Sequence, residues 1–199
     1  MDTKANSEKI GLVFLLDRSG SMYGSEKDTI GGFNSFISRE KAQKVEANVT
    51  TILFDHEYEM LYKRKDLYEV ENLTEKEYYV RGSTALLDAI GKTILTLDKE
   101  IDNKVLFVIT TDGRENASVE FTRRQIKNMI NNHNWEFIYL GADIDSYAEA
   151  ARFGIKKSRT SNYVKSCDGI EKMYNAVTRA RVSFQNKGYI ENNWKEDLE

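Results

Sequence analysis

IGLVFLL, residues 10–16, is a continuous apolar run that ends at Asp17. Two further runs have a similar form: KVLFVITT, residues 104–111, ends at Asp112, and WEFIYL covers residues 135–140. Runs of this length without alternation of polar and apolar residues are typical of strands that are buried on both faces, as in a parallel sheet. The sequence therefore predicts a parallel sheet that contains these strands.

Two neighbouring segments predict an antiparallel edge. VTTILF, residues 49–54, has the pattern of another strand, and residues 57–63 follow it after only two residues. In this second segment Tyr58, Met60 and Tyr62 alternate with polar residues and would share one face. Because so short a connection joins antiparallel strands, residues 57–63 are expected to form an antiparallel edge strand.

Helical patterns separate the predicted strands. One helix is expected to begin after Ser118 as its N-cap, and a short one over residues 145–153 is expected to stop at Gly154. The helix after Ser118 has the apolar stripe Val119, Ile126, Met129 and Ile130. Three further helices have the stripes Ile30, Phe33 and Ile37; Leu86, Leu87, Ile90, Ile94 and Leu97; and Ile170, Met173, Tyr174, Val177 and Phe184. Residues 159–162 are expected to add a weak sixth strand. The alternation of strands and helices along the chain predicts an α/β fold. We expect a three-layer doubly wound sandwich whose central sheet is mostly parallel with one antiparallel edge strand.

The composition is that of one globular domain. The chain has 199 residues, of which 40% are hydrophobic and 31% charged, and its net charge is −3. This charge offers no basic field for nucleic acid or for an anionic membrane. The single Cys excludes an intrachain disulfide and a Cys-based metal cage, and two His are too few for a His-rich metal centre. Any metal is therefore expected to be held mainly by oxygen, which favours a hard cation.

Polar segments flank the predicted domain. We expect one domain over residues 8–185, with polar terminal segments at residues 1–7 and 186–199; whether the second segment packs on the domain is left open. The first residues lack the apolar core of a signal peptide, and the longest apolar run is too short to span a bilayer. The sequence therefore predicts a cytoplasmic protein, and we expect a monomer.

Polar residues that carry oxygen follow the predicted strands. Asp17-Arg18-Ser19-Gly20-Ser21 follows the first apolar run, Asp112-Gly113 follows the run at residues 104–111, and Gly82-Ser83-Thr84 precedes a predicted helix. In open α/β sheets, ligands bind beyond the carboxyl ends of the strands, so these segments should converge if the strands are parallel. Carboxylates and hydroxyls suit the near-octahedral oxygen shell of Mg²⁺. The sequence thus predicts a divalent-cation site, Mg²⁺ or Mn²⁺, at this edge.

The three segments resemble the von Willebrand factor type A (vWA) domain and its metal-ion-dependent adhesion site (MIDAS). The family pattern is Asp-x-Ser-x-Ser, then a distant Thr, then a distant Asp. Here Asp17-Arg18-Ser19-Gly20-Ser21, Gly82-Ser83-Thr84 and Thr110-Thr111-Asp112-Gly113 match it in order. The resemblance covers roughly residues 8–185, where the order of strands and helices also agrees. The chain looks closest to compact, stand-alone bacterial or phage members.

The resemblance implies a complete MIDAS motif and a function. Its metal residues would be Asp17, Ser19, Ser21, Thr84 and Asp112. The three hydroxyls would bind the metal directly, and the two aspartates would act wholly or partly through water. One coordination position would be left for an acidic side chain of a protein partner. The expected function is that of a metal-dependent protein-binding module without enzymatic activity. The resemblance also implies a switch linked to movement of the terminal helix, residues 168–184.

Structural roles for these residues are a weaker interpretation. Asp17 and Ser19 could cap a following helix, Thr84 could be an N-cap and Asp112 could lie in an ordinary turn, but three such coincidences at one edge are less probable than a metal site.

Other functions fit the sequence less well. A phosphoryl-transfer enzyme of the haloacid dehalogenase type also has Asp after its first strand. That mechanism needs an acid/base residue two positions later, where this chain has Ser19, and neither His lies in these loops. A nucleotide-binding site would need a glycine-rich phosphate loop, which the first strand lacks.

Overall fold

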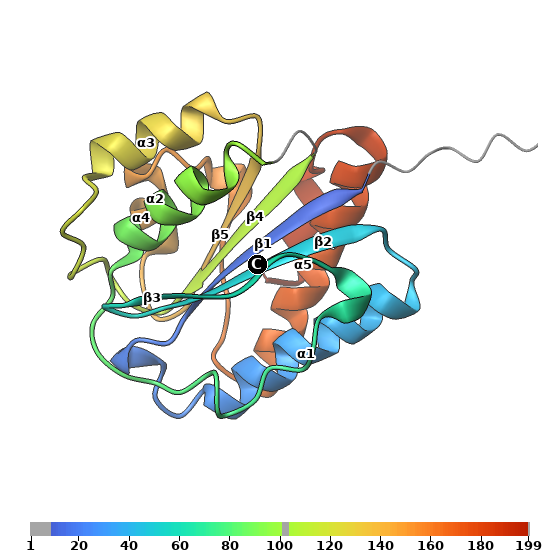
Figure 1. The fold of residues 1–199 in the computed structure, drawn as a ribbon, viewed down its shortest axis with the longest axis horizontal. Coiled ribbons are helices and arrows are strands. Elements are labelled where there is room, and N and C mark those ends of the chain that lie inside the picture. Colours follow the sequence, from blue (N-terminus) through green and yellow to red (C-terminus); the bar gives the residue numbers. More distant parts are fainter. Residues whose placement is uncertain (1–8, 101–103, 199) are drawn as a thin grey trace, which may run out of the picture.

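The computed structural model describes residues 9–100 and 104–198 and has a six-stranded sheet in the order β3-β2-β1-β4-β5-β6 (Figure 1). The strands are β1 (Ile10–Asp17), β2 (Ala47–Phe54), β3 (Tyr58–Asp66), β4 (Val105–Thr111), β5 (Glu136–Gly141) and β6 (Thr160–Asn162). Neighbouring strands are parallel, except that β2 and β3 are antiparallel. The predicted fold class and its antiparallel edge strand are confirmed.

Helices cover both faces of this sheet. They are α1 (Glu26–Ala42), α2 (Leu86–Leu97), α3 (Arg123–Asn132), α4 (Ser146–Arg152) and α5 (Cys167–Lys187). The first and last lie on one face, and α2, α3 and α4 lie on the other (Figure 1). In the parts of the chain that the structure describes, every helix is too short or too polar to cross a bilayer.

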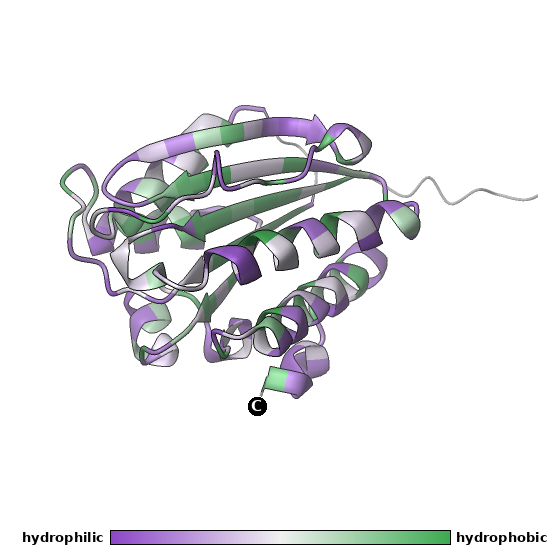
Figure 2. Ribbon diagram, turned by 90° about the horizontal axis from the view of Figure 1, so that it is seen from below, coloured by the Kyte–Doolittle hydropathy of each residue, from purple (hydrophilic) through white to green (hydrophobic). Residues whose placement is uncertain are grey.

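The alternation of side chains along β1 joins the two layers. Phe14 packs against Phe33 and Phe36 of α1, with ring centroids 5.6 and 5.2 Å apart. The next residue, Leu15, faces the opposite way and belongs to the cluster under α2, which includes Ile90. Because both faces of β1 are covered, the strand needs an apolar side chain at nearly every position. Figure 2 shows this as hydrophobic colour along the central strands.

Helix α3 begins later than the sequence predicted. Its N-cap is Thr122, whose hydroxyl accepts from the backbone N–H of Gln125 in a reciprocal capping box. Ser118 is therefore not the N-cap, and Val119 is an exposed loop residue. The reason lies in tertiary contacts: the backbone N–H of Val119 donates to the carboxylate of Asp88 in α2, which holds this segment as a loop.

The end of the chain packs on the domain. Ile190 and Trp194 are buried, and the indole N–H of Trp194 donates to the carbonyl of Ser158 at 2.8 Å. The guanidinium of Arg179 in α5 donates to the backbone carbonyl of Trp194 at 3.0 Å. Residues 186–198 thus add to the core beside α5, whereas the predicted segment at residues 1–7 lies outside the described residues.

Candidate metal centre

The three predicted loops meet at the carboxyl edge of the sheet, next to β1 and β4. The chain leaves β1 toward α1 on one face and leaves β4 toward α3 on the other. Such a reversal opens the crevice in which doubly wound sheets bind ligands. The loop before α2 is held there because Gly20 donates its N–H to the carbonyl of Gly82 at 3.0 Å, and Arg81 donates to the carbonyl of Arg18 at 2.9 Å.

Three hydroxyl oxygens converge beside Gly113. A Cβ placed on this glycine would lie 2.7 Å from Oγ1 of Thr84, 3.2 Å from Oγ of Ser21 and 3.5 Å from Oγ of Ser19. The two serine oxygens are 3.2 Å apart. Neighbouring ligands of Mg²⁺ are about 3 Å apart, given metal–oxygen distances near 2.1 Å in an octahedron. The arrangement of the hydroxyls therefore fits a small divalent cation.

Both predicted aspartates are buried at the same place. Asp17 ends β1, and its carboxylate accepts hydrogen bonds from the N–H of Ser19 at 2.7 Å and from the hydroxyl of Thr111. Asp112 follows β4, and its carboxylate accepts a hydrogen bond from the hydroxyl of Ser21. With the three hydroxyls beside Gly113, all five residues of the predicted site lie together.

The electrostatics of the pair favour a bound cation. Burial raises the pKa of Asp17 to about 6, although hydrogen bonds from Thr111 and Ser19 oppose the shift. The charge of Asp112 raises it further. Since both effects penalise the ionised form of Asp17, a positive charge placed between the two carboxylates would relieve them.

The loop after Asp112 holds Thr84 in place. The backbone N–H of Thr84 donates to the side-chain carbonyl of Asn116 at 2.9 Å, and Asn116 returns a backbone hydrogen bond to the Thr84 carbonyl at 3.0 Å. Glu115 accepts from the backbone N–H of Leu87 in the first turn of α2, at 2.9 Å. The residue at the N-cap position is Ala85, so Thr84 does not cap this helix. Its hydroxyl is instead directed at the candidate site.

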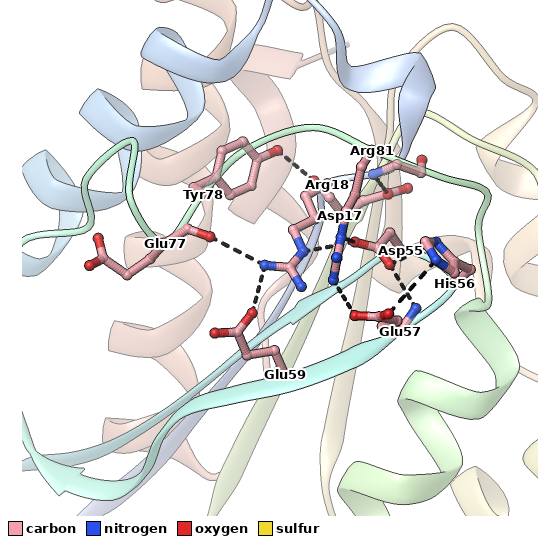
Figure 3. Close-up of polar contacts among 10 residues, drawn as sticks. Asp17, Arg18, Asp55, His56, Glu57, Glu59, Glu77, Tyr78 and Arg81 are labelled. Atoms are coloured by element: carbon pink, nitrogen blue, oxygen red, sulfur yellow. Dashed lines mark hydrogen bonds and ion pairs between the residues drawn. The ribbon is translucent and has the colours of Figure 1, made fainter.

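A buried ion-pair network that the sequence analysis missed supports the first two loops (Figure 3). Arg18 is fully buried, and its Nε donates to Oδ2 of Asp55 at 2.9 Å. The same oxygen accepts from Nε of Arg81, also at 2.9 Å. Arg18 additionally pairs with Glu59 of β3 at 2.7 Å. The residue between Asp17 and Ser19 thus ties the first loop to the loop that leads to Thr84.

Asp55 joins these loops through its backbone as well. Its carbonyl accepts the N–H of Ala85, the residue after Thr84, at 2.8 Å. Burial raises the pKa of the Asp55 carboxyl, but hydrogen bonds from the Glu57 N–H and from Arg81 and Arg18 outweigh it and hold the pKa below its ordinary value. The carboxylate is therefore the form that the folded protein favours. A signal for this role is weak in the sequence, because Asp55 has the appearance of an ordinary turn residue after β2.

Lys165 also lies at the site and was not among the predicted residues. It belongs to the short loop between β6 and α5, and its Nζ is 2.7 Å from Oδ2 of Asp112 and 2.8 Å from Oδ2 of Asp143. Burial lowers the pKa of Lys165, but these two hydrogen bonds outweigh it and hold the pKa above its ordinary value. A positive charge is therefore already paired with one of the predicted aspartates.

The candidate site would bind a metal through oxygen atoms of carboxylates and hydroxyls. Across residues 9–100 and 104–198, no group of three or more His, Cys, Asp or Glu side chains is arranged to hold a metal ion. The candidate site instead combines two carboxylates with three hydroxyls, which are the five predicted residues. A set of hard, mostly neutral oxygens suits Mg²⁺ or Mn²⁺ better than a soft metal that prefers thiolate.

Comparisons with known proteins address the fold. No protein-family model matches the chain, and no curated protein sequence matches it. The structure is similar to proximal thread matrix protein 1 from the mussel byssus (TM-score 0.65, 12% identity, 85% of this chain and 45% of that chain). It is also similar to the vWF domain of the type V pili tip protein Mfa5 from Porphyromonas gingivalis (TM-score 0.66, 10% identity, 86% of this chain and 95% of that chain).

A third similar structure is a von Willebrand factor type A protein from Catenulispora acidiphila (TM-score 0.62, 13% identity, 87% of this chain and 42% of that chain). In another structure of the mussel protein, with a TM-score of 0.65, the MIDAS motif is occupied by zinc. The chain spans less than half of the mussel and Catenulispora chains. These structural similarities show that the chain has the vWA fold. Because the sequence identities are only 10–13%, they show the fold alone.

Proposed function

We propose that the chain is a metal-dependent protein-binding module that takes up an acidic side chain of its partner. The observation that carries this proposal is the convergence of Asp17, Ser19, Ser21, Thr84 and Asp112 at the edge where doubly wound sheets bind ligands. The zinc-occupied MIDAS of the mussel structure supports it, because that protein shares the fold. The preferred metal would be Mg²⁺ or Mn²⁺, which suits hard oxygen ligands.

The residues divide into two roles in this proposal. Ser19, Ser21 and Thr84 would bind the metal through their hydroxyls, and Asp17 and Asp112 would balance its charge directly or through water. A bound divalent cation would supply an electrophilic position for a carboxylate of the partner. Because the three hydroxyls that would bind the metal are neutral, the metal would stay electrophilic toward an incoming acid.

Binding is a better account of this site than catalysis. A phosphotransferase of the haloacid dehalogenase type would need an acid/base residue two positions after Asp17, and Ser19 stands there. The imidazole of His56 is 3.1 Å from the carboxylate of Asp55, on the side of the Arg18 network. We therefore expect no turnover of phosphate esters that depends on Asp17.

The wider setting is also proposed. We infer a monomeric cytoplasmic protein of bacterial or phage type, with an acidic protein segment as its partner rather than nucleic acid or a membrane. The net charge of −3 favours this choice over a polyanionic partner.

Titration calorimetry with Mg²⁺ and Mn²⁺ tests the proposed function. Asp17→Ala should abolish binding and leave the circular dichroism spectrum unchanged. Asp28→Ala, in the first turn of α1, serves as the control for the loss of one acidic side chain. Capture of partner proteins should also be lost in EDTA. Unchanged metal affinity in Asp17→Ala would contradict the proposal, as would hydrolysis of a phosphate ester that disappears in Asp17→Asn.

A further inference from the structure

Lys165 makes three contacts at the candidate metal centre. Its Nζ is 2.7 Å from Oδ2 of Asp112, 2.8 Å from Oδ2 of Asp143 and 3.3 Å from the backbone carbonyl of Ser21. An ammonium group has three N–H donors, so these three oxygens match its full capacity. Two of the three belong to residues of the predicted metal set, Asp112 and Ser21.

The position of this ammonium has an electrostatic consequence. Asp112 accepts a hydrogen bond from the hydroxyl of Ser21 on one carboxylate oxygen and from Lys165 on the other. Lys165 therefore supplies positive charge at a carboxylate that a metal would also use. A divalent cation bound beside Asp112 would be repelled by the ammonium at short range.

The second partner of Lys165 offers an alternative position for its charge. Asp143 follows β5 with a left-handed backbone, φ 56°, and its side chain is 68% exposed. Asp is among the residues that tolerate this conformation. An ammonium held between a buried carboxylate and an exposed one can release the first while it keeps the second.

From these contacts we propose that Lys165 is a tethered cation that competes with the metal for Asp112 and thereby sets the metal affinity of the site. When metal binds, Lys165 gives up Asp112 and stays paired with Asp143. This inference rests on the proposed function, because it requires that the site binds a divalent cation. It assigns to Lys165 and Asp143 roles that the MIDAS pattern does not contain.

The central experiment compares metal affinities by calorimetry in Lys165→Met, Lys165→Gln and the native chain. Removal of the ammonium should tighten Mg²⁺ and Mn²⁺ binding by about tenfold or more, since a repulsive charge at a few ångströms is lost. Lys172→Met is the matched control. This lysine lies on α5 and pairs with Asp168 at 2.7 Å, so its loss changes the net charge by the same amount away from the site.

A double-mutant cycle separates Asp143 from a general field effect. Asp143→Asn should weaken metal binding in the native chain, because Lys165 is then left with Asp112. In the Lys165→Met background the same change should have a much smaller effect. Equal effects in both backgrounds would overturn the role given to Asp143.

Thermal unfolding provides a second measurement that needs no binding curve. In EDTA the Lys165 variants should unfold at a lower temperature than the native chain, because Asp112 loses its counter-charge. At saturating Mg²⁺ this difference should vanish or reverse. A difference that is the same in both conditions would mean that Lys165 has only a structural role.

The results distinguish this inference from the proposed function. If the native chain binds metal and the Lys165 variants bind it equally or more weakly, the tethered-cation role is wrong and the proposed function stands. If neither the native chain nor any Lys165 variant binds Mg²⁺ or Mn²⁺, both are wrong. Binding by the variants alone would support the role of Lys165 and contradict the proposed function, since the ammonium would then keep the metal out of the native chain.

Discussion

The guanidinium of Arg18 and the carboxylate of Asp55 form a fully buried ion pair, with 2.9 Å between Nε and Oδ2. Arg18 follows the last residue of β1, and Asp55 follows the last residue of β2. The pair therefore fixes the ends of two adjacent strands relative to each other. Because Arg18 lies between Asp17 and Ser19, it also fixes the loop that carries three of the five candidate ligands.

Asp55→Asn should lower the free energy of unfolding by about 3–5 kcal/mol, because Arg18 would lose its buried counter-charge and keep only the half-exposed Glu59. Urea unfolding measures this loss. Glu100→Gln is the control: Glu100 pairs with Lys63 at the surface, where the two side chains are 40% and 41% exposed, and such pairs contribute about 0–1 kcal/mol. Similar losses in the two variants would show that the buried network does not stabilise the fold.

The contribution of Asp55 to the free energy of unfolding should decrease at low pH. Folding lowers its pKa below the ordinary value of 3.8, so the folded state favours the carboxylate. Its stabilising effect is therefore present above that value and is lost as the pH falls below it. The difference in unfolding free energy between the native chain and Asp55→Asn should be constant between about pH 7 and 5 and should shrink at about pH 3 and below. A difference that grows on acidification would contradict this assignment.

Gly113→Ala should weaken Mg²⁺ binding by at least about tenfold, because Mg²⁺ demands near-ideal octahedral geometry. The added Cβ would lie 2.7 Å from the Thr84 hydroxyl and would displace it. Gly31→Ala in α1 is the control, since nothing lies within 4 Å of its Cβ position. Unaltered affinity in Gly113→Ala, measured by calorimetry, would mean that the hydroxyls beside this glycine do not bind the metal.

Trp194→Ala should lower the free energy of unfolding by about 3–5 kcal/mol, as expected for loss of a buried indole. The side chain is buried against the domain and donates to Ser158. Tyr189→Ala provides a comparison nearby, because this residue is 54% exposed and the loss of its side chain should change stability by no more than about 0.5 kcal/mol. A loss below about 1 kcal/mol for Trp194→Ala would place the terminal segment outside the cooperative unit.

Much of the fold and the location of the candidate site could be predicted from the sequence. The apolar runs that become β1, β4 and β5 lack alternation because both faces of each strand are covered, so their composition reveals a parallel sheet. Parallel strands end at one edge, which is why Asp17 and Asp112 could be placed together although they are far apart in the chain. The short connection to β3 likewise predicted its antiparallel direction.

Errors arose where distant contacts outweigh local pattern. Ser118 has the spacing of an N-cap, yet the carboxylate of Asp88 binds the backbone after it and delays α3 until Thr122. A capping residue is recognised from its neighbours in sequence, whereas this competing acceptor comes from another helix. The packing of Trp194 could not be predicted for a similar reason, because its partners belong to the 3₁₀ turn at Ser158 and to α5.

Local sequence patterns were enough to predict the sheet, its antiparallel edge strand and the oxygen-bearing residues at the carboxyl ends of the strands. These features follow from patterns along each strand and from the direction in which parallel strands end. The ion pairs of Lys165 with Asp112, and of Asp55 with both Arg18 and Arg81, depend instead on how the loops pack in the folded chain. Charged side chains carry no periodic signal, and the partner of each is chosen by the distance and burial that the packed loops create.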